Sequence, residues 1–144
     1  IAADMFIPKV DVKVEFFDGQ SITTTIVSQS LESLFKEADF ITLHVPAQEG
    51  YIVDEKTLAI MKDGVGIVNC ARGGVIDEVA LIKALDSGKV SFAGLDVFES
   101  EPKPEMTILM HPKISLTPHI GAATGEAQDR IGTELASQII SLLG

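Results

Sequence analysis

Three side chains with complementary chemistry follow short apolar stretches of the sequence: Arg72, Glu101 and His119. Histidine titrates near neutral pH, so it can accept a proton from a hydroxyl group. A carboxylate beside the imidazole holds one tautomer and favours the cationic form. An arginine guanidinium suits a substrate carboxylate or a polarised carbonyl. Together these residue types could remove a hydride and a proton from a secondary alcohol, provided that the fold brings them to one place.

Arg72 follows a strand and precedes a turn and a helix. Apolar residues over 65–68 indicate a buried strand, and Gly73 and Gly74 allow the chain to turn. A helical pattern over 77–87 begins at an aspartate that can cap it and ends before a glycine. Ligands of open α/β sheets collect at the carboxyl ends of strands, which is where this pattern places Arg72. An ion-paired surface arginine is the alternative interpretation of the local pattern.

The rest of the chain alternates apolar strands with amphipathic helices. Strands are predicted over 40–43, 65–69, 92–95 and 114–117, and helices over 30–35, 57–61, 77–87 and 124–142. This alternation predicts an α/β fold with a mostly parallel sheet covered by helices on both faces. A short strand is also predicted over 1–3, and a loop over 96–113.

Residues 10–16 and 22–27 alternate apolar and polar side chains on either side of Asp18–Gly19, which is a hairpin signal. They predict an antiparallel hairpin appended to the main sheet as a surface feature.

Composition narrows the possible partners. The net charge is −10, and no cluster of Lys and Arg offers a surface for a phosphate backbone, so we expect no nucleic-acid partner. No apolar run reaches the roughly 18 residues of a membrane span, and there is no signal-peptide pattern. Cys70 is the single cysteine and is expected to be a small buried hydrophobe. These features fit a cytoplasmic protein, and no metal site is predicted.

Three segments resemble, in the right order, the signatures of the D-isomer-specific 2-hydroxyacid dehydrogenase family. They are Asn-Cys-Ala-Arg-Gly-Gly-Val-Ile-Asp at 69–77, Gly-Leu-Asp-Val-Phe-Glu-Ser-Glu-Pro at 94–102 and Pro-His-Ile-Gly-Ala at 118–122. With His-Val-Pro at 44–46 they span nearly the whole chain. The resemblance implies a Rossmann-type, doubly wound NAD-binding domain over 1–123. It also implies that a C-terminal helix over 124–144 crosses to a substrate domain.

The resemblance assigns roles to the three side chains. Arg72 matches the substrate anchor, His119 the acid–base and Glu101 the carboxylate that pairs with the histidine. Glu99 lies two residues too early for that pairing.

Further matches concern NAD. Asp4 corresponds to the acid that accepts hydrogen bonds from the adenosine ribose, and Asp96 to a residue that contacts the nicotinamide carboxamide. The other positions expected to line the cofactor are His44, Val45, Pro46, Cys70, Ala71, Arg72, His119, Gly121 and Ala122.

Two of these assignments have local alternatives. An aspartate after a strand, such as Asp4, is commonly a turn or cap residue. A histidine at a strand end, such as His44, is commonly structural. In addition, the glycine-rich turn expected about 20 residues before a ribose-binding acid is not in the sequence. We therefore expect that turn and a substrate domain to lie upstream of Ile1.

Within the family, the residues around Cys70 and the helix start at 125–128 are most similar to members that oxidise 3-phospho-D-glycerate. The resemblance thus implies NAD-dependent formation of 3-phosphohydroxypyruvate for serine biosynthesis by a homodimer or homotetramer. Two alternatives stay open. One is a reductase of glyoxylate, hydroxypyruvate or lactate. The other is a dinucleotide-sensing corepressor, for which partner binding matters more than turnover.

Overall fold

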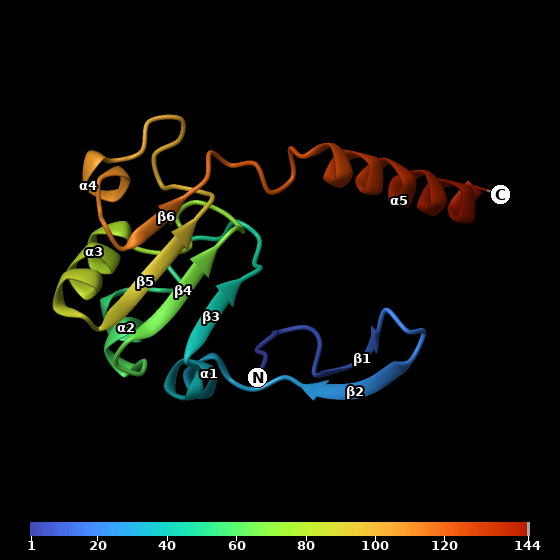
Figure 1. Ribbon diagram of the computed structural model, residues 1–144, viewed down its shortest axis with the longest axis horizontal. Coiled ribbons are helices and arrows are strands. Elements are labelled where there is room, and N and C mark those ends of the chain that lie inside the picture. Colours follow the sequence, from blue (N-terminus) through green and yellow to red (C-terminus); the bar gives the residue numbers. More distant parts are fainter. Residues whose placement is uncertain (144) are drawn as a thin grey trace.

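A computed structural model describes residues 1–143 of the chain, which form two separate sheets (Figure 1). The larger sheet has four strands in the order β3-β4-β5-β6, and all neighbouring strands are parallel. Their bounds are Phe40–Leu43 for β3, Val65–Asn69 for β4, Val90–Leu95 for β5 and Ile114–Leu116 for β6. The predicted parallel α/β sheet is confirmed.

Five helices accompany the strands: α1 Leu31–Glu37, α2 Glu55–Ile60, α3 Glu78–Ser87, α4 Met106–Leu109 and α5 Gly125–Leu143. Side-chain oxygens of Ser30, Asp54 and Asp77 accept backbone N–H bonds at the starts of α1, α2 and α3. Gly88 ends α3 with a φ of 80°, which a glycine adopts without strain. The segment of α4 was expected to be a loop, because a single helical turn gives no periodic signal.

Helices α1 to α4 share one hydrophobic core with one face of the sheet. Phe35, Leu58, Leu81 and Ile108 from these helices are buried in the same cluster as Ile67 of β4. On the opposite face, Phe40 is 74% exposed, and its ring centroid lies 6.1 Å from that of Phe92. The prediction that helices cover both faces is therefore wrong for residues 1–143. The strand order never reverses in this part of the chain, so right-handed crossovers place every connecting helix on the same side.

The hairpin forms as predicted but lies apart from the main sheet. Strands β1, Lys9–Glu15, and β2, Ser21–Val27, pair only with each other. The expectation that the hairpin is appended to the main sheet is therefore wrong: its strands pair with each other from Lys9↔Val27 to Glu15↔Ser21 and form no ladder with β3 to β6. The strand expected over 1–3 is reduced to a single parallel bridge between Ala2 and Ser28.

Helix α5 leads away from the sheet and has no buried residue (Figure 1). Ile131, Leu135, Ile139 and Leu142 recur at helical spacing and are about half exposed or more. The predicted helical segment 124–144 ends at residue 144, which lies outside the described residues. None of the helices in residues 1–143 combines the length and the apolar character that a membrane span requires.

Candidate active site

The carboxyl ends of three neighbouring strands form one edge at which the candidate residues gather. The register aligns Asn69 of β4 with Leu95 of β5, and Leu95 with Leu116 of β6. Chain segments that follow these positions therefore start side by side. The segment after β4 carries Arg72 and the segment after β6 carries His119, and these two strands are the neighbours of β5.

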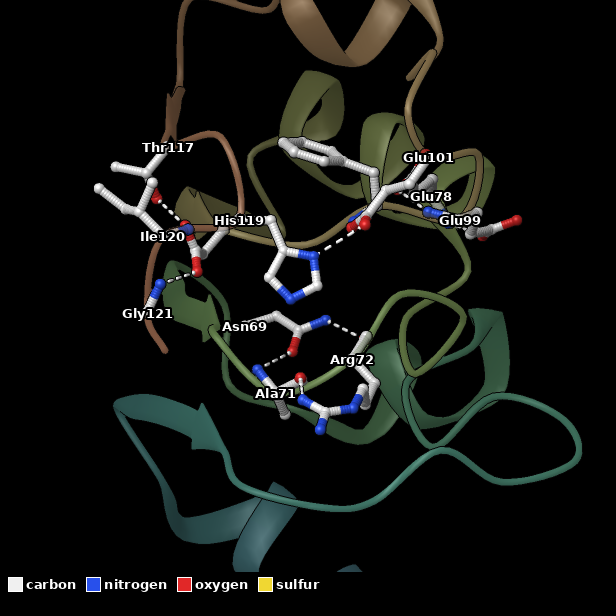
Figure 2. A network of polar contacts seen from close by, with 12 residues as sticks. Asn69, Ala71, Arg72, Glu78, Glu99, Glu101, Thr117, His119, Ile120 and Gly121 are labelled. Carbon is white, nitrogen blue, oxygen red and sulfur yellow. Dashed lines mark hydrogen bonds and ion pairs between the residues drawn. The ribbon is translucent and has the colours of Figure 1, made fainter. Parts of the chain in front are cut away.

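His119 and Glu101 are in direct contact. The Nδ1 atom of His119 lies 2.8 Å from Oε2 of Glu101, and the two side chains are 46% and 34% exposed. The other carboxylate oxygen of Glu101 accepts the backbone N–H of Phe98 at 2.9 Å. Figure 2 shows the opposite edge of the imidazole, which carries Nε2, turned toward the segment from Asn69 to Arg72. The carboxylate thus holds one ring nitrogen while the other faces a separate part of the site.

The contact with His119 changes the ionisation of Glu101. The hydrogen bond with His119, followed by the N–H of Phe98, lowers the pKa of the Glu101 carboxyl below its ordinary value. A lowered folded-state pKa stabilises the fold fully above the ordinary value, and this stabilisation is lost as the pH falls through the lowered pKa.

We expect a carboxyl ¹³C NMR titration to give Glu101 a midpoint below the value of about 4.3 that is typical of a free glutamate. Glu101→Gln assigns the resonance. His119→Gly, which tolerates the same backbone conformation, should raise the midpoint, because it removes the side chain whose hydrogen bond lowers the pKa most. A midpoint at or above the free value in the unaltered chain would contradict the contact.

Asp96 anchors the loop on which His119 stands. Its buried carboxylate accepts the hydroxyl of Thr117 at 2.6 Å and the backbone N–H groups of Ile120 and Gly121, both at 2.9 Å. Burial opposes ionisation of Asp96, but these hydrogen bonds outweigh it and keep the pKa of the carboxyl below its ordinary value. His119 itself has a φ of 56°, an unfavourable backbone conformation for histidine. The hydrogen bonds to Asp96 on both sides of His119 hold the loop in this conformation.

Asn69 organises the turn that carries Arg72. Its side chain is buried; Oδ1 accepts the N–H of Ala71 and Nδ2 donates to the carbonyl of Arg72, both at 3.0 Å. The Arg72 side chain is exposed, and its Nη1 donates to the carbonyl of Ala71 at 2.6 Å. A guanidinium has five N–H donors. Within residues 1–143 the others make no hydrogen bond to protein, so they can receive a carboxylate.

Three of the candidate residues at this edge, Cys70, Gly121 and Ala122, are exposed. Cys70 is exposed, which corrects the expectation that it is buried: it follows the last residue of β4 and lies outside the core. Gly121 and Ala122 are also exposed. A Cβ atom added to Gly121 would come within 3.0 Å of Asp96 Oδ2, so the bare glycine lets its own N–H approach this buried carboxylate closely.

The remaining cofactor candidates make no contact with the His119 pair. The exposed His44 has its Nε2 atom 3.0 Å from the hydroxyl of Thr42; the next residues, Val45 and Pro46, are half-buried and exposed. Oδ1 of Asp4 accepts the N–H groups of two residues that follow it in the chain, Phe6 first and then Ile7, which lowers the pKa of this carboxyl.

These contacts are those of a turn aspartate, the local alternative for Asp4. Its second carboxylate oxygen accepts no hydrogen bond within residues 1–143.

A cavity of about 440 Å³ lies beside the imidazole on the side of Glu101. Its walls are mainly apolar; they include Glu101, Thr117 and His119 but neither Arg72 nor Asp96. The apolar lining residues are Phe98, Pro102, Pro104, Leu109, Leu116 and Pro118. Among the residues of the chain that the structure covers, no group of three His, Cys, Asp or Glu side chains is placed to hold a metal ion.

Sequence reasoning overlooked several residues that shape the site. Asn69 was part of a recognised motif but received no role, although an Asn two residues before a turn N–H is a signal for an Asx turn. Glu99 was set aside as too early to pair with histidine, and it instead contacts Glu78 and Tyr51. No local pattern indicates these contacts, because the partners are 21 and 48 positions away in the chain.

Known proteins share both the sequence and the arrangement of these elements. The family model described as "D-isomer specific 2-hydroxyacid dehydrogenase, NAD binding domain" matches residues 6–121. A hydroxypyruvate reductase from Thermotoga maritima is 48% identical over all of this chain and 45% of its own length. A D-3-phosphoglycerate dehydrogenase from Sus scrofa is 44% identical over 78% of this chain and 22% of its own length.

The fold comparison agrees. The crystal structure of a glyoxylate reductase from Paecilomyes thermophila superposes with a TM-score of 0.69 and 45% identity, over 74% of this chain and 33% of that one. The chain thus spans less than half the length of the relatives it matches. From the family match over residues 6–121 and these identities, the chain belongs to the D-isomer-specific 2-hydroxyacid dehydrogenases, within their NAD-binding domain.

Proposed function

We propose that this chain provides the NAD-binding and acid–base half of an enzyme that oxidises a D-2-hydroxy acid to a 2-oxo acid. The observation that carries the proposal is the 2.8 Å contact between His119 Nδ1 and Glu101 Oε2, at the same sheet edge as Arg72. Oxidation of a carboxylate-bearing alcohol requires a carboxylate–imidazole pair and a guanidinium that has no acidic partner, as Arg72 has none within residues 1–143.

Each residue contributes one part of the reaction. Arg72 binds the substrate carboxylate and orients C2 and its hydroxyl group. The Nε2 atom of His119 accepts the hydroxyl proton while the C2–H bond breaks and the C2–O bond becomes a double bond. Glu101 stabilises the imidazolium that results. When bound, NAD would supply the acceptor for the hydride that leaves C2, with Asp4 and Asp96 among the residues that would hold it. In the reverse direction His119 returns the proton to the carbonyl oxygen.

For the substrate we propose 3-phospho-D-glycerate, oxidised to 3-phosphohydroxypyruvate in serine biosynthesis. The similarity to D-3-phosphoglycerate dehydrogenases supports this choice. A second candidate is the hydroxypyruvate–glyoxylate pair, because the hydroxypyruvate reductase is 48% identical over the entire chain. Both substrates carry the carboxylate and the C2 oxygen that Arg72 and His119 would contact.

Several further expectations belong to the same proposal. NAD is preferred over NADP, since Asp4 would repel a ribose phosphate. Residues 1–123 serve the cofactor, and the helix at 124–144 leads to a substrate-binding domain. A cytoplasmic location and a homodimer or homotetramer stay predictions.

The test is a panel of 2-hydroxy acids with the protein produced from its whole reading frame. Absorbance of the reduced nicotinamide is followed with 3-phospho-D-glycerate, D-glycerate, glycolate and D-lactate, each with NAD and with NADP. We expect the highest kcat/KM with NAD and 3-phospho-D-glycerate. A higher value with D-glycerate or glycolate would favour the second candidate. Tight NAD binding without turnover on any acid would refute an enzymatic role.

A further inference from the structure

The strongest feature outside the proposed chemistry is a reciprocal contact between two acidic residues. The backbone N–H of Glu78 donates to Glu99 Oε1 at 2.8 Å, and the backbone N–H of Glu99 donates to Glu78 Oε1 at 2.8 Å (Figure 2). The hydroxyl of Tyr51 donates to the other oxygen of Glu99 at 3.2 Å. We call these three residues the Glu78–Glu99 clasp.

The clasp is costly, which argues against a merely solvated acidic loop. Glu78 is only 8% exposed. Burial raises the pKa of its carboxyl; the negative charges of Glu99 and Glu105 act in the same direction, and the N–H of Glu99 opposes them. A buried carboxylate near other negative charges destabilises a fold unless the geometry that it maintains offsets the cost, and here Glu78 is the buried member while Glu99 is exposed. The geometry maintained here is that of the segment from Phe98 to Glu101.

This segment connects the clasp to the acid–base pair. Phe98, the residue before Glu99, donates its N–H to Glu101 Oε1 at 2.9 Å. The carbonyl oxygen of Phe98 faces Gly73, where an added Cβ would lie only 1.9 Å away. The segment is thus held against the first residue of α3 and against the turn beside Arg72. Glu101, at the other end of this segment, contacts His119.

Through Tyr51, the loop after β3 also contacts Glu99. Residues 52 and 53 also donate their N–H groups to the Val75 carbonyl at 2.9 and 3.1 Å, which places this loop beside the start of α3. The loops that follow β3, β4 and β5 therefore converge on one carboxylate, that of Glu99.

We propose that the Glu78–Glu99 clasp is a positioning device that sets the place of Glu101 relative to His119 and Arg72. Glu99 is a positioning residue, since it touches neither imidazole nor guanidinium. The inference rests on the proposed function for its kinetic consequence, but its geometric consequence can be measured without turnover. Misplacement of a catalytic group by about 1 Å can cost about 100-fold in rate.

The kinetic test compares Glu99→Ala with Glu99→Gln in the protein produced from its whole reading frame. Glu99→Ala should lower kcat by about 10- to 100-fold and change the KM for NAD by less than about threefold. Glu99→Gln should restore kcat to within about threefold, because its amide oxygen can still accept the N–H of Glu78 and its amide group can still bond Tyr51. Glu55→Ala removes an exposed carboxylate from α2 and is the charge-matched control.

The geometric test follows the hydrogen-bonded Nδ1 proton of His119 by ¹H NMR without substrate. The downfield resonance should be present in the unaltered protein and in Glu99→Gln and should be lost in Glu99→Ala. If the unaltered protein transfers no hydride, the proposed function fails, and this resonance still decides whether the clasp positions Glu101. If Glu99→Ala does not fold, Tyr51→Phe decides, with an expected loss of about fivefold in kcat from one hydrogen bond.

Two results would overturn the inference. One is a Glu99→Ala variant that keeps both kcat and the downfield resonance. The other is a Glu99→Gln variant that loses as much activity as Glu99→Ala at an unchanged melting temperature, since that would assign the effect to charge instead of position.

Discussion

Replacing His119 with asparagine should lower kcat for hydride transfer by about 100- to 10,000-fold, the usual contribution of a general acid–base. Asparagine is the informative substitution because His119 has a φ of 56°, a conformation that asparagine tolerates better than alanine does. Its amide can also donate a hydrogen bond to Glu101 but cannot accept the hydroxyl proton. The variant therefore removes the chemistry while the loop keeps its shape.

Three measurements separate this result from misfolding. NAD affinity, measured by fluorescence quenching, and the melting temperature should change little in His119→Asn. His111→Gln is the matched control: His111 contacts Asp86 at the C-terminal end of α3 and should leave kcat within about twofold. A His119→Asn variant with near-normal turnover would refute the assignment of the acid–base.

Replacing Arg72 with lysine should lower kcat/KM for the hydroxy acid by about 100- to 1,000-fold, comparable to the loss of one preorganised donor to a developing oxyanion. Lysine keeps the charge but cannot present the planar pair of donors that a carboxylate accepts. The substrate KM should rise, because the carboxylate is bound in the ground state as well as in the transition state. NAD affinity should be nearly unaffected.

Arg130 provides the control for this substitution, since it is the other arginine of the sequence and is exposed on α5. Arg130→Lys should keep kcat/KM within about twofold, as surface substitutions usually do. Steady-state kinetics over a range of hydroxy-acid concentrations checks both variants. An unchanged KM and kcat in Arg72→Lys would show that the guanidinium does not contact the substrate.

Much of the main sheet could be read from the sequence because its signals are local. Apolar runs predicted β3, β4 and β6, and capping residues such as Asp77 gave the start of α3. The ends of these strands then predicted which loops would meet. The separation of the hairpin and the open face of the sheet could not be predicted in this way, because both depend on the order in which strands pair.

The site residues likewise divide into those that local motifs predict and those whose contacts depend on distant parts of the chain. Arg72, Glu101 and His119 were found from residue type and motif, and the roles assigned to them await the substitutions above. The clasp could not be predicted from the sequence, because Tyr51 and Glu99 are 48 positions apart and a tyrosine in a loop indicates no particular contact. Asp96 was expected to serve the nicotinamide, whereas its hydrogen bonds to Thr117, Ile120 and Gly121 also hold the loop of His119.

The close approach of Gly73 to the Phe98 carbonyl has a dynamic consequence. No side chain fits between the two backbones, so no rotamer change can absorb a shift of one against the other. We therefore expect the turn that carries Arg72 and the segment that carries Glu101 to move together. Relaxation-dispersion NMR should accordingly report one shared exchange rate for the amides of Gly73 and Glu99.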